Sequence, residues 1–174
     1  EVFGPGHADF TFWRKYGIRD HRGGGRSSGR ETAGRVAAGA VARKILEQRG
    51  VTITAYALEI AGIRAETIDC AVIENNPVRC PDMAAAKKME AAILAARNDK
   101  DSVGGIIELR VTGVPAGLGD PVFDKLDARL AHAILSIGAT KGFEIGRGFA
   151  AAQLRGSENN DAMKDGAFVT NNAG

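Results

Sequence analysis

Residues 23–46 read GGGRSSGRETAGRVAAGAVARKIL, a glycine run followed by a stretch of small residues. The three glycines allow the backbone to come close to a ligand. Ser28 and Glu31 have the S-x-x-E spacing of a capping box, which predicts a helix that begins directly after Ser28. A helix N-terminus beside Arg26 and Arg30 favours bound phosphate or carboxylate. The stretch therefore predicts an anion site.

The same stretch has a simpler interpretation. Gly23–Gly25 could form a flexible turn and the arginines a solvated face, since the spacing matches neither a Walker A loop nor the G-x-G-x-x-G dinucleotide fingerprint. The helix that follows is rich in small residues: Ala33, Ala37, Ala38, Gly39, Ala40 and Ala42. A helix so poor in bulk is expected to pack closely against its neighbours or against a cofactor.

The composition predicts one globular domain over residues 1–174. The chain is 44% hydrophobic and 25% charged, which is sufficient for a single core. Residues 1–50 carry ten Lys or Arg against five acids, although the formal net charge of the whole chain is only +2. Few aromatic residues are interleaved with these cations, which favours a small polyanionic substrate over a nucleic acid. No apolar run reaches the length of a membrane span, so no membrane partner is expected.

Residues 4–9, Gly-Pro-Gly-His-Ala-Asp, are punctuated like a tight loop around a histidine. Histidine titrates near neutral pH, so His7 could move a proton under working conditions. The structural alternative is that His7 only hydrogen-bonds Asp9 and holds the loop together. The sequence leaves both interpretations open.

Cys70 and Cys80 lie ten residues apart, with no C-x-x-C motif and no histidine at ligand spacing. This pattern indicates neither a zinc site nor a disulfide framework. The two residues are interpreted as buried thiols of a protein from a reducing compartment.

The order of expected elements indicates an α/β chain of the α+β type with antiparallel sheet, because several connections are short. Helices are expected over 29–46, 83–97 and 121–136, the second capped by Asp82 and the third by Asp120. Strands are expected at 51–55, 67–73, 107–111, 143–145 and 149–155. The third helix has an apolar stripe that is interpreted as core: Phe123, Leu126, Leu130, Ala133, Ile134 and Ile137.

Several long motifs of this chain closely resemble chorismate synthase, in one register from end to end. They are GHAD (6–9), KYGIRD (15–20), GGRSSGRETA (24–33), RVAAGA (35–40), GVPAGLGDPVFDKLD (113–127), KGFEIG (141–146) and TNNAG (170–174). The resemblance implies an internal piece of a longer chain, truncated at both ends. It also implies a fold with helices layered between antiparallel β-sheets, and a homotetramer.

The resemblance implies a cytoplasmic lyase of the shikimate pathway, in aromatic amino acid biosynthesis. Its reaction is the anti 1,4-elimination of phosphate from 5-enolpyruvylshikimate 3-phosphate, which gives chorismate. The family requires reduced FMN, with NADPH as the reductant in members that reduce the flavin themselves. The chain lacks the family's first histidine motif and its C-terminal motifs, so by itself it is not expected to catalyse. The alternative function is therefore a catalytically incomplete core that binds flavin or anions.

The resemblance also assigns roles to individual positions. His7 matches a proton donor to the reduced flavin, and Arg30 matches a substrate-binding arginine. Arg26, Ser27 and Ser28 match the flavin-binding segment, and Gly138 and Ala139 match a pair, usually Asn-Ala, that lies along the flavin. The chain departs from the family at Gly4, where an arginine is usual, and at Gly138. The first departure is expected to weaken the substrate site, whereas the second preserves a contact made by the backbone.

Overall fold

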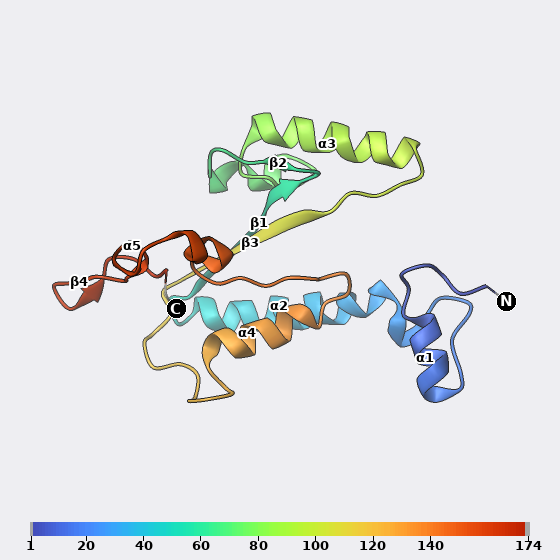
Figure 1. Cartoon of the computed structure of the whole chain (residues 1–174), viewed down its shortest axis with the longest axis horizontal. Coiled ribbons are helices and arrows are strands. Elements are labelled where there is room, and N and C mark those ends of the chain that lie inside the picture. The colour runs from blue at the N-terminus through green and yellow to red at the C-terminus, as the bar shows by residue number, and fades with distance from the viewer. Residues whose placement is uncertain (1, 173–174) are drawn as a thin grey trace. The chain divides into compact units, whose positions relative to one another are not determined.

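The computed structural model describes residues 2–172 (Figure 1). The chain divides into two compact units, one formed by Glu1–Gly39 with Pro115–Gly174 and the other by Ala40–Val114. Helix α2 (Thr32–Glu47) contains the boundary between them. Of the motif at 170–174, Ala173 and Gly174 lie outside the described residues.

The unit Ala40–Val114 is built on a three-stranded antiparallel sheet with the order β2-β1-β3. Strand β1 (Thr52–Ile60) pairs along its length with β3 (Gly105–Thr112) and at its end with the short β2 (Ile63–Arg64). The β1–β3 register shifts between Ala57 and Glu59, which marks a bulge.

Helix α3 (Met83–Asn98) lies over β2 and a 3-10 helix formed by Cys70–Asn75 (Figure 1). Asp82 caps α3, because its Oδ1 accepts hydrogen bonds from the N–H groups of Ala84 and Ala85 at 2.9 and 3.1 Å. The core of this unit comes from the sheet, the 3-10 helix and α3: Tyr56, Leu58, Ala65, Ile73, Cys80, Ala85, Ala86 and Met89. Burial of these side chains is the main stabilising term of the unit.

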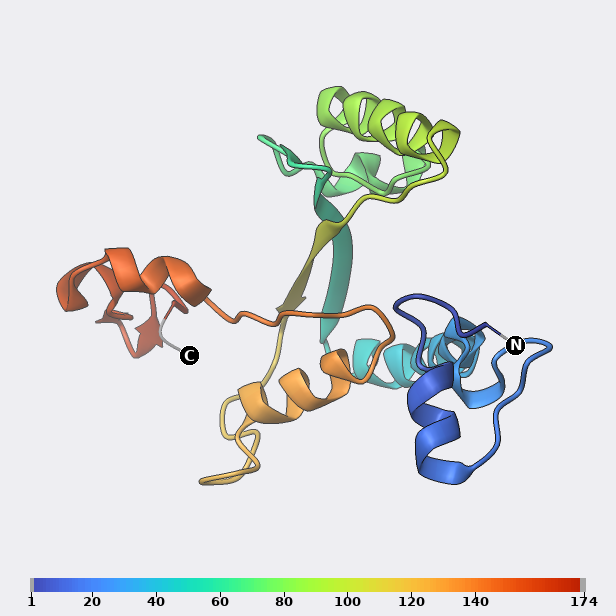
Figure 2. The same cartoon turned by 45° about the vertical axis from the view of Figure 1, so that its right-hand side comes forward.

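The other unit is mostly helical and loop-rich. It contains α1 (Asp9–Tyr16), 3-10 helices at Gly25–Ser27, Gly29–Glu31 and Gly148–Gln153, α4 (Leu126–Leu135), α5 (Gly156–Asn159) and a hairpin of β4 (Met163–Lys164) and β5 (Ala167–Phe168). Figure 2 shows α4 and the last hairpin from a second direction. Among the described residues of this unit, only Asp9 is buried.

The sequence predicted the helices at 29–46 and 83–97 and the strands at 51–55 and 107–111, and these are confirmed. Residues 29–31 form a 3-10 turn before α2. The strand expected at 67–73 is wrong, because the Asp69 carboxylate accepts from the Ala71 N–H at 2.9 Å and starts a 3-10 helix.

Three further expectations are corrected. Residues 143–145 are not a strand. Where a strand was expected at 149–155, Gly148–Gln153 form a 3-10 helix, whose Phe149 N–H donates to the Glu144 carboxylate at 3.2 Å. Helix α4 begins at Leu126 and not at Pro121. The Asp120 N–H bonds the Asp124 carbonyl at 2.9 Å, so a turn occupies the segment where the cap was expected.

Burial also differs from expectation in the helices. Neither α2 nor α4 buries a residue among those described, and Phe123 of the predicted core stripe is 87% exposed. Cys80 is a buried free thiol as expected, but Cys70 is exposed.

Within residues 2–172 no group of three or more His, Cys, Asp or Glu is arranged to hold a metal ion. No described helix is long and apolar enough to cross a membrane.

Candidate functional site

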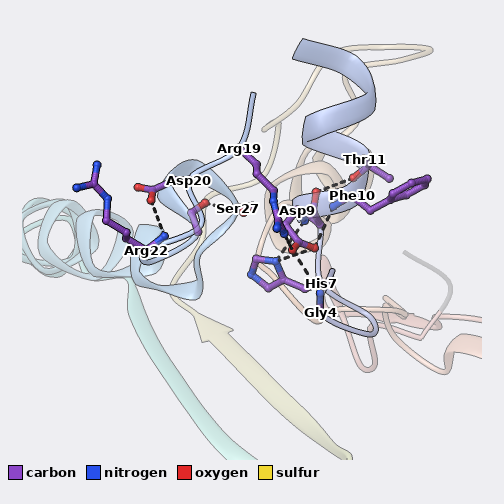
Figure 3. Close-up of polar contacts among 11 residues, drawn as sticks. Gly4, His7, Asp9, Phe10, Thr11, Arg19, Asp20, Arg22 and Ser27 are labelled. Atoms are coloured by element: carbon purple, nitrogen blue, oxygen red, sulfur yellow. Dashed lines mark hydrogen bonds and ion pairs between the residues drawn. The ribbon is translucent and has the colours of Figure 1, made fainter. Parts of the chain in front are cut away.

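The start of α1 places His7 beside a buried carboxylate (Figure 3). Asp9 accepts hydrogen bonds from the N–H groups of Gly4 and Phe10 at 3.3 and 2.9 Å, and from Arg19 Nη1 at 2.7 Å. Burial alone would raise the pKa of Asp9. The two backbone donors and Arg19 outweigh it and hold the pKa below the usual value. Asp9 is therefore ionised at neutral pH.

His7 is held at one of its two ring nitrogens. Its Nδ1 accepts a hydrogen bond from the Asp9 N–H at 3.2 Å and lies 3.5 Å from Asp9 Oδ1. Because Nδ1 is the acceptor, the neutral ring carries its proton on Nε2. The contact with Asp9 that the structural interpretation required is present, and it leaves Nε2 available for the proton transfer that the other interpretation required.

The glycine-rich loop lies against the His7 ring. Gly24 has φ +82°, and a Cβ at this position would come within 3.3 Å of His7 Cε1 and 3.4 Å of Ser27 Oγ. The Ser27 hydroxyl donates to the Gly24 carbonyl at 2.6 Å, which closes the turn. Glycine at position 24 therefore provides both the backbone conformation and the space for the histidine.

Arg30 lies against the same loop, at Gly23. A Cβ at Gly23 would lie 2.9 Å from Arg30 Nη1, so the guanidinium group covers that glycine. Ser28 Oγ accepts from the Arg30 N–H at 3.2 Å. The structure thus brings His7, Ser27 and Arg30 together around Gly23 and Gly24.

The predicted capping box forms only in part. Ser28 caps the helical turn, but Glu31 does not return the contact, because its carboxylate binds Arg26 at 2.8 Å. The Arg26 side chain is 83% exposed. A cation with this exposure is accessible to an incoming anion, although Glu31 competes for it.

Gly138 and Ala139 form the turn after α4. Ala139 has φ +67°, and a Cβ built on Gly138 meets nothing within 4 Å, so the larger residue usual in the family would have room. Among the described residues, this pair makes no hydrogen bond or ion pair with the His7 loop. Two residues before the pair, the Ser136 carbonyl accepts a hydrogen bond from Nη2 of Arg35 in α2 at 3.0 Å.

The sequence interpretation missed Arg19 and the full role of Asp9. Arg19 lies 4.4 Å from the centroid of the Phe3 ring, and its side chain is only 11% exposed. The nearby signals in the sequence were Asp9 two residues after His7 and a basic stretch of no particular pattern. The contact between Arg19 and Asp9 depends on how α1 ends, at Gly17 with φ +72°.

The donors at this loop fit an anionic ligand such as the phosphate of a flavin nucleotide. Hydroxyl groups, backbone glycine and guanidinium groups lie together there, with two carboxylates at the edges of the loop: Glu31 binds Arg26, and Asp20 lies against Gly25 and accepts from the Arg22 N–H at 2.9 Å. The fold and the site define a mixed α/β protein in which a histidine and cationic side chains surround a glycine-rich loop.

Comparison with known proteins identifies the family. The family described as chorismate synthase matches residues 1–174. The chorismate synthase of Desulfatibacillum aliphaticivorans is 59% identical over 173 residues, which cover 99% of this chain and 48% of that protein. The chorismate synthase of Methanosarcina mazei is 58% identical over 178 residues, which cover 98% and 49%.

A structural match agrees with the sequence matches. A crystal structure of chorismate synthase superposes with a TM-score of 0.84 at 32% identity, covering 95% of this chain and 56% of that one. The chain therefore belongs to the chorismate synthase family, and its fold is the mixed α/β fold of that structure. It spans about half the length of the curated relatives it matches.

Proposed function

We propose that this chain supplies one wall of a chorismate synthase active site. The reaction is the anti 1,4-elimination of phosphate from 5-enolpyruvylshikimate 3-phosphate, which gives chorismate and inorganic phosphate. Membership of the family supports this proposal, and one observation carries it: His7, Ser27 and Arg30 meet at the Gly23–Gly24 turn. A phosphate-bearing dicarboxylate requires the positive charge and fixed donors found there.

The proposed cofactor is reduced FMN, with NADPH as a candidate reductant. Arg26, Ser27 and Ser28 would hold it through their guanidinium and hydroxyl groups, and Gly138 and Ala139 would offer backbone along its ring. When bound, reduced FMN supplies electron density to the substrate as the allylic phosphate leaves.

His7 would provide a proton close to the flavin. Its Nδ1 is occupied by the Asp9 N–H, so the proton available for transfer is at Nε2. The His7 side chain is 42% exposed, so a ligand can approach it. No described residue hydrogen-bonds Nε2.

Arg30 would bind the substrate. We expect Arg30→Ala in the complete enzyme to weaken substrate binding by about 1.5–3 kcal/mol, as expected for a lost charged hydrogen bond. Isothermal titration calorimetry with 5-enolpyruvylshikimate 3-phosphate measures the Kd for the substrate. Arg43→Ala, which removes an exposed ion pair with Glu47 at 2.9 Å, is the control and should leave the Kd unchanged. An unchanged Kd for Arg30→Ala would refute the assignment.

We also propose the family's layered architecture, with helices between antiparallel sheets, and its homotetramer in the cytoplasm. The antiparallel β1–β3 pair supports the first, as do apolar side chains that are exposed on α2 and β3, such as Val36, Val41 and Ile107. Light scattering of the complete enzyme tests the tetramer, and a monomer at micromolar concentration would contradict it.

A second candidate function is a folded core that binds flavin or anions without turnover. The observation that favours it is that the chain spans about half the length of its relatives, while α2 and α4 bury no described residue. Titrating this chain with FMN under anaerobic reducing conditions, with and without the substrate, separates the candidates. Binding without chorismate formation supports the core, and turnover supports a complete site.

A further inference from the structure

We propose that Asp9 and Arg19 are positioning residues that fix the ring of His7 and place its exchangeable proton at Nε2. This inference rests on the proposed function, in which His7 transfers a proton. It concerns Asp9, which contacts His7, and Arg19, which binds Asp9. Neither residue has a role in the function proposed above.

The first step is the immobilisation of the Asp9 carboxylate. Oδ1 accepts from the Phe10 N–H at 2.9 Å, and Oδ2 accepts from Gly4 at 3.3 Å and Arg19 at 2.7 Å. Both oxygens are engaged, so the group cannot rotate without losing a charge-assisted bond. The Asp9 and Arg19 side chains are 12% and 11% exposed, which reduces screening of this ion pair by solvent.

The second step is the support of Arg19 by an aromatic cluster. Its guanidinium group lies 4.4 Å from the centroid of Phe3, and that ring packs edge-on against Phe10 at 5.3 Å and beside Trp13 at 5.7 Å. Phe10 and Trp13 belong to α1, the helix that Asp9 begins. The arginine is therefore held on the helix that carries the carboxylate.

The third step is the effect on His7, which is held from two sides. Nδ1 accepts a hydrogen bond from the Asp9 N–H (Figure 3). On the other side, a Cβ at Gly24 would lie 3.3 Å from Cε1. With the ring fixed in this way, Nε2 is the nitrogen that remains to exchange a proton. Loss of Arg19 would release the carboxylate that anchors the first residue of α1, and with it the Asp9 N–H that holds the ring.

The test compares Arg19→Gln and the more conservative Arg19→Lys in the complete enzyme. Arg19→Gln is expected to reduce kcat by about 10–100-fold, as loss of an outer partner of a metal-binding histidine does, with KM for the substrate unchanged. Arg19→Lys restores the charge and should recover part of kcat. Arg43→Gln, in an exposed ion pair, is the matched control and should change neither constant.

A double-mutant cycle shows whether Arg19 acts through His7. The effect of Arg19→Gln should disappear in a His7→Ala background. An equal loss of kcat in both backgrounds, or a loss that Arg19→Lys does not relieve, would overturn the proposal.

A spectroscopic readout is independent of turnover. Nitrogen-15 spectra of the complete enzyme distinguish the two ring nitrogens of His7, whose signals are assigned as those that disappear in His7→Ala. We expect an unprotonated Nδ1 in the wild type, and signals averaged between tautomers in Arg19→Gln. Unchanged nitrogen signals would overturn the positioning role. If His7→Ala retains full activity, the proposed function fails, and these spectra still decide the positioning.

Discussion

Tyr56 and Glu108 lie directly opposite each other in the β1–β3 pair, and the Tyr56 hydroxyl donates a hydrogen bond to the Glu108 carboxylate. Arg110 Nε binds the same carboxylate at 2.6 Å. The Tyr56 side chain is buried, so this polar contact is made at the edge of the core of its unit. Such a pair fixes the register of the two strands as well as stabilising them.

We predict that Tyr56→Phe lowers the free energy of unfolding by about 1.5 kcal/mol, the lower end for a bond to a charged group, because Glu108 is partly exposed. Chemical denaturation measures this. Tyr16→Phe is the control, since Tyr16 is 57% exposed, and should change stability by less than about 0.5 kcal/mol. Equal effects of the two substitutions would show that the hydroxyl contact contributes nothing.

Burial, followed by the bond to Glu108, raises the pKa of Tyr56 above its ordinary value. A tyrosine whose pKa is higher in the folded state than in the unfolded state stabilises the fold while it is protonated. This stabilisation is complete below the unfolded-state pKa and is lost as the pH rises above it. Stability should therefore fall above about pH 10. In Tyr16→Phe, which leaves Tyr56 as the single tyrosine, ultraviolet titration should detect ionisation only as the unit unfolds. Ionisation of the folded chain near the ordinary value would contradict this.

Asp82 should control acid stability in the same unit. Four backbone N–H groups donate to it, from Ala85, Glu66, Thr67 and Ala84, and they lower its pKa from 3.8 to about 2 despite the opposing effect of burial. Its stabilisation is therefore complete above about pH 4 and lost as the pH falls toward 2.

Asp82→Asn should flatten the loss of stability between about pH 4 and pH 2, because the substituted chain has no charge to lose there. Urea midpoints across this range provide the measurement. Asp99→Asn, at the other end of α3, is the matched control and should retain the wild-type pH dependence. An unchanged slope in Asp82→Asn would mean that other carboxylates govern acid unfolding.

Gly24→Ala should impair the site more than the fold. Any L-residue at φ +82° costs about 1 kcal/mol, and here the new Cβ would also press on His7 Cε1. Gly166→Ala is the matched control, since Gly166 has φ +80° and open space around it. Both variants should lose similar stability, and only Gly24→Ala should lose turnover. Equal turnover in the two variants would argue against packing of the loop on His7.

Gly4→Arg should strengthen substrate binding, because it restores the arginine usual in the family at this position. A Cβ at residue 4 would lie 3.3 Å from His7 Cβ, so the new side chain starts beside the site with only a small adjustment. We expect tighter binding by about 1.5–3 kcal/mol, measured as the Kd for the phosphate substrate. Gly4→Gln adds bulk without charge and should not reproduce the gain. A gain with both variants would point to packing instead of charge.

The sequence predicted elements where the local signal was strong. The Asp82 cap and the alternation in 107–111 were sufficient for α3 and β3. The predictions failed at 67–73 and 149–155, where apolar residues suggested strands but the Asp69 and Glu144 carboxylates bind nearby backbone N–H groups and favour 3-10 helices. Such contacts are short-ranged, and the apolar pattern conceals them.

Prediction of the candidate site followed the same division. His7 and Arg30 were found from their motifs. Their positions beside the Gly23–Gly24 turn depend on contacts between residues that are not adjacent in the sequence, which the motifs do not show. Arg19 could not be distinguished from other basic residues, because its position depends on Phe3 and on the turn that ends α1. The burial predicted for α2 and α4 is not found among the described residues, and the chain spans about half the length of its relatives.

The central claim is that His7 transfers a proton at a flavin site built on the Gly23–Gly24 turn. The most direct measurement is an anaerobic titration of the complete enzyme with reduced FMN, with and without 5-enolpyruvylshikimate 3-phosphate, comparing the wild type with His7→Ala. We predict that His7→Ala binds the flavin with nearly the wild-type Kd but forms chorismate at least about 100-fold more slowly, the range for loss of a general acid. Wild-type turnover in His7→Ala, or equal losses of turnover and flavin binding, would contradict the claim.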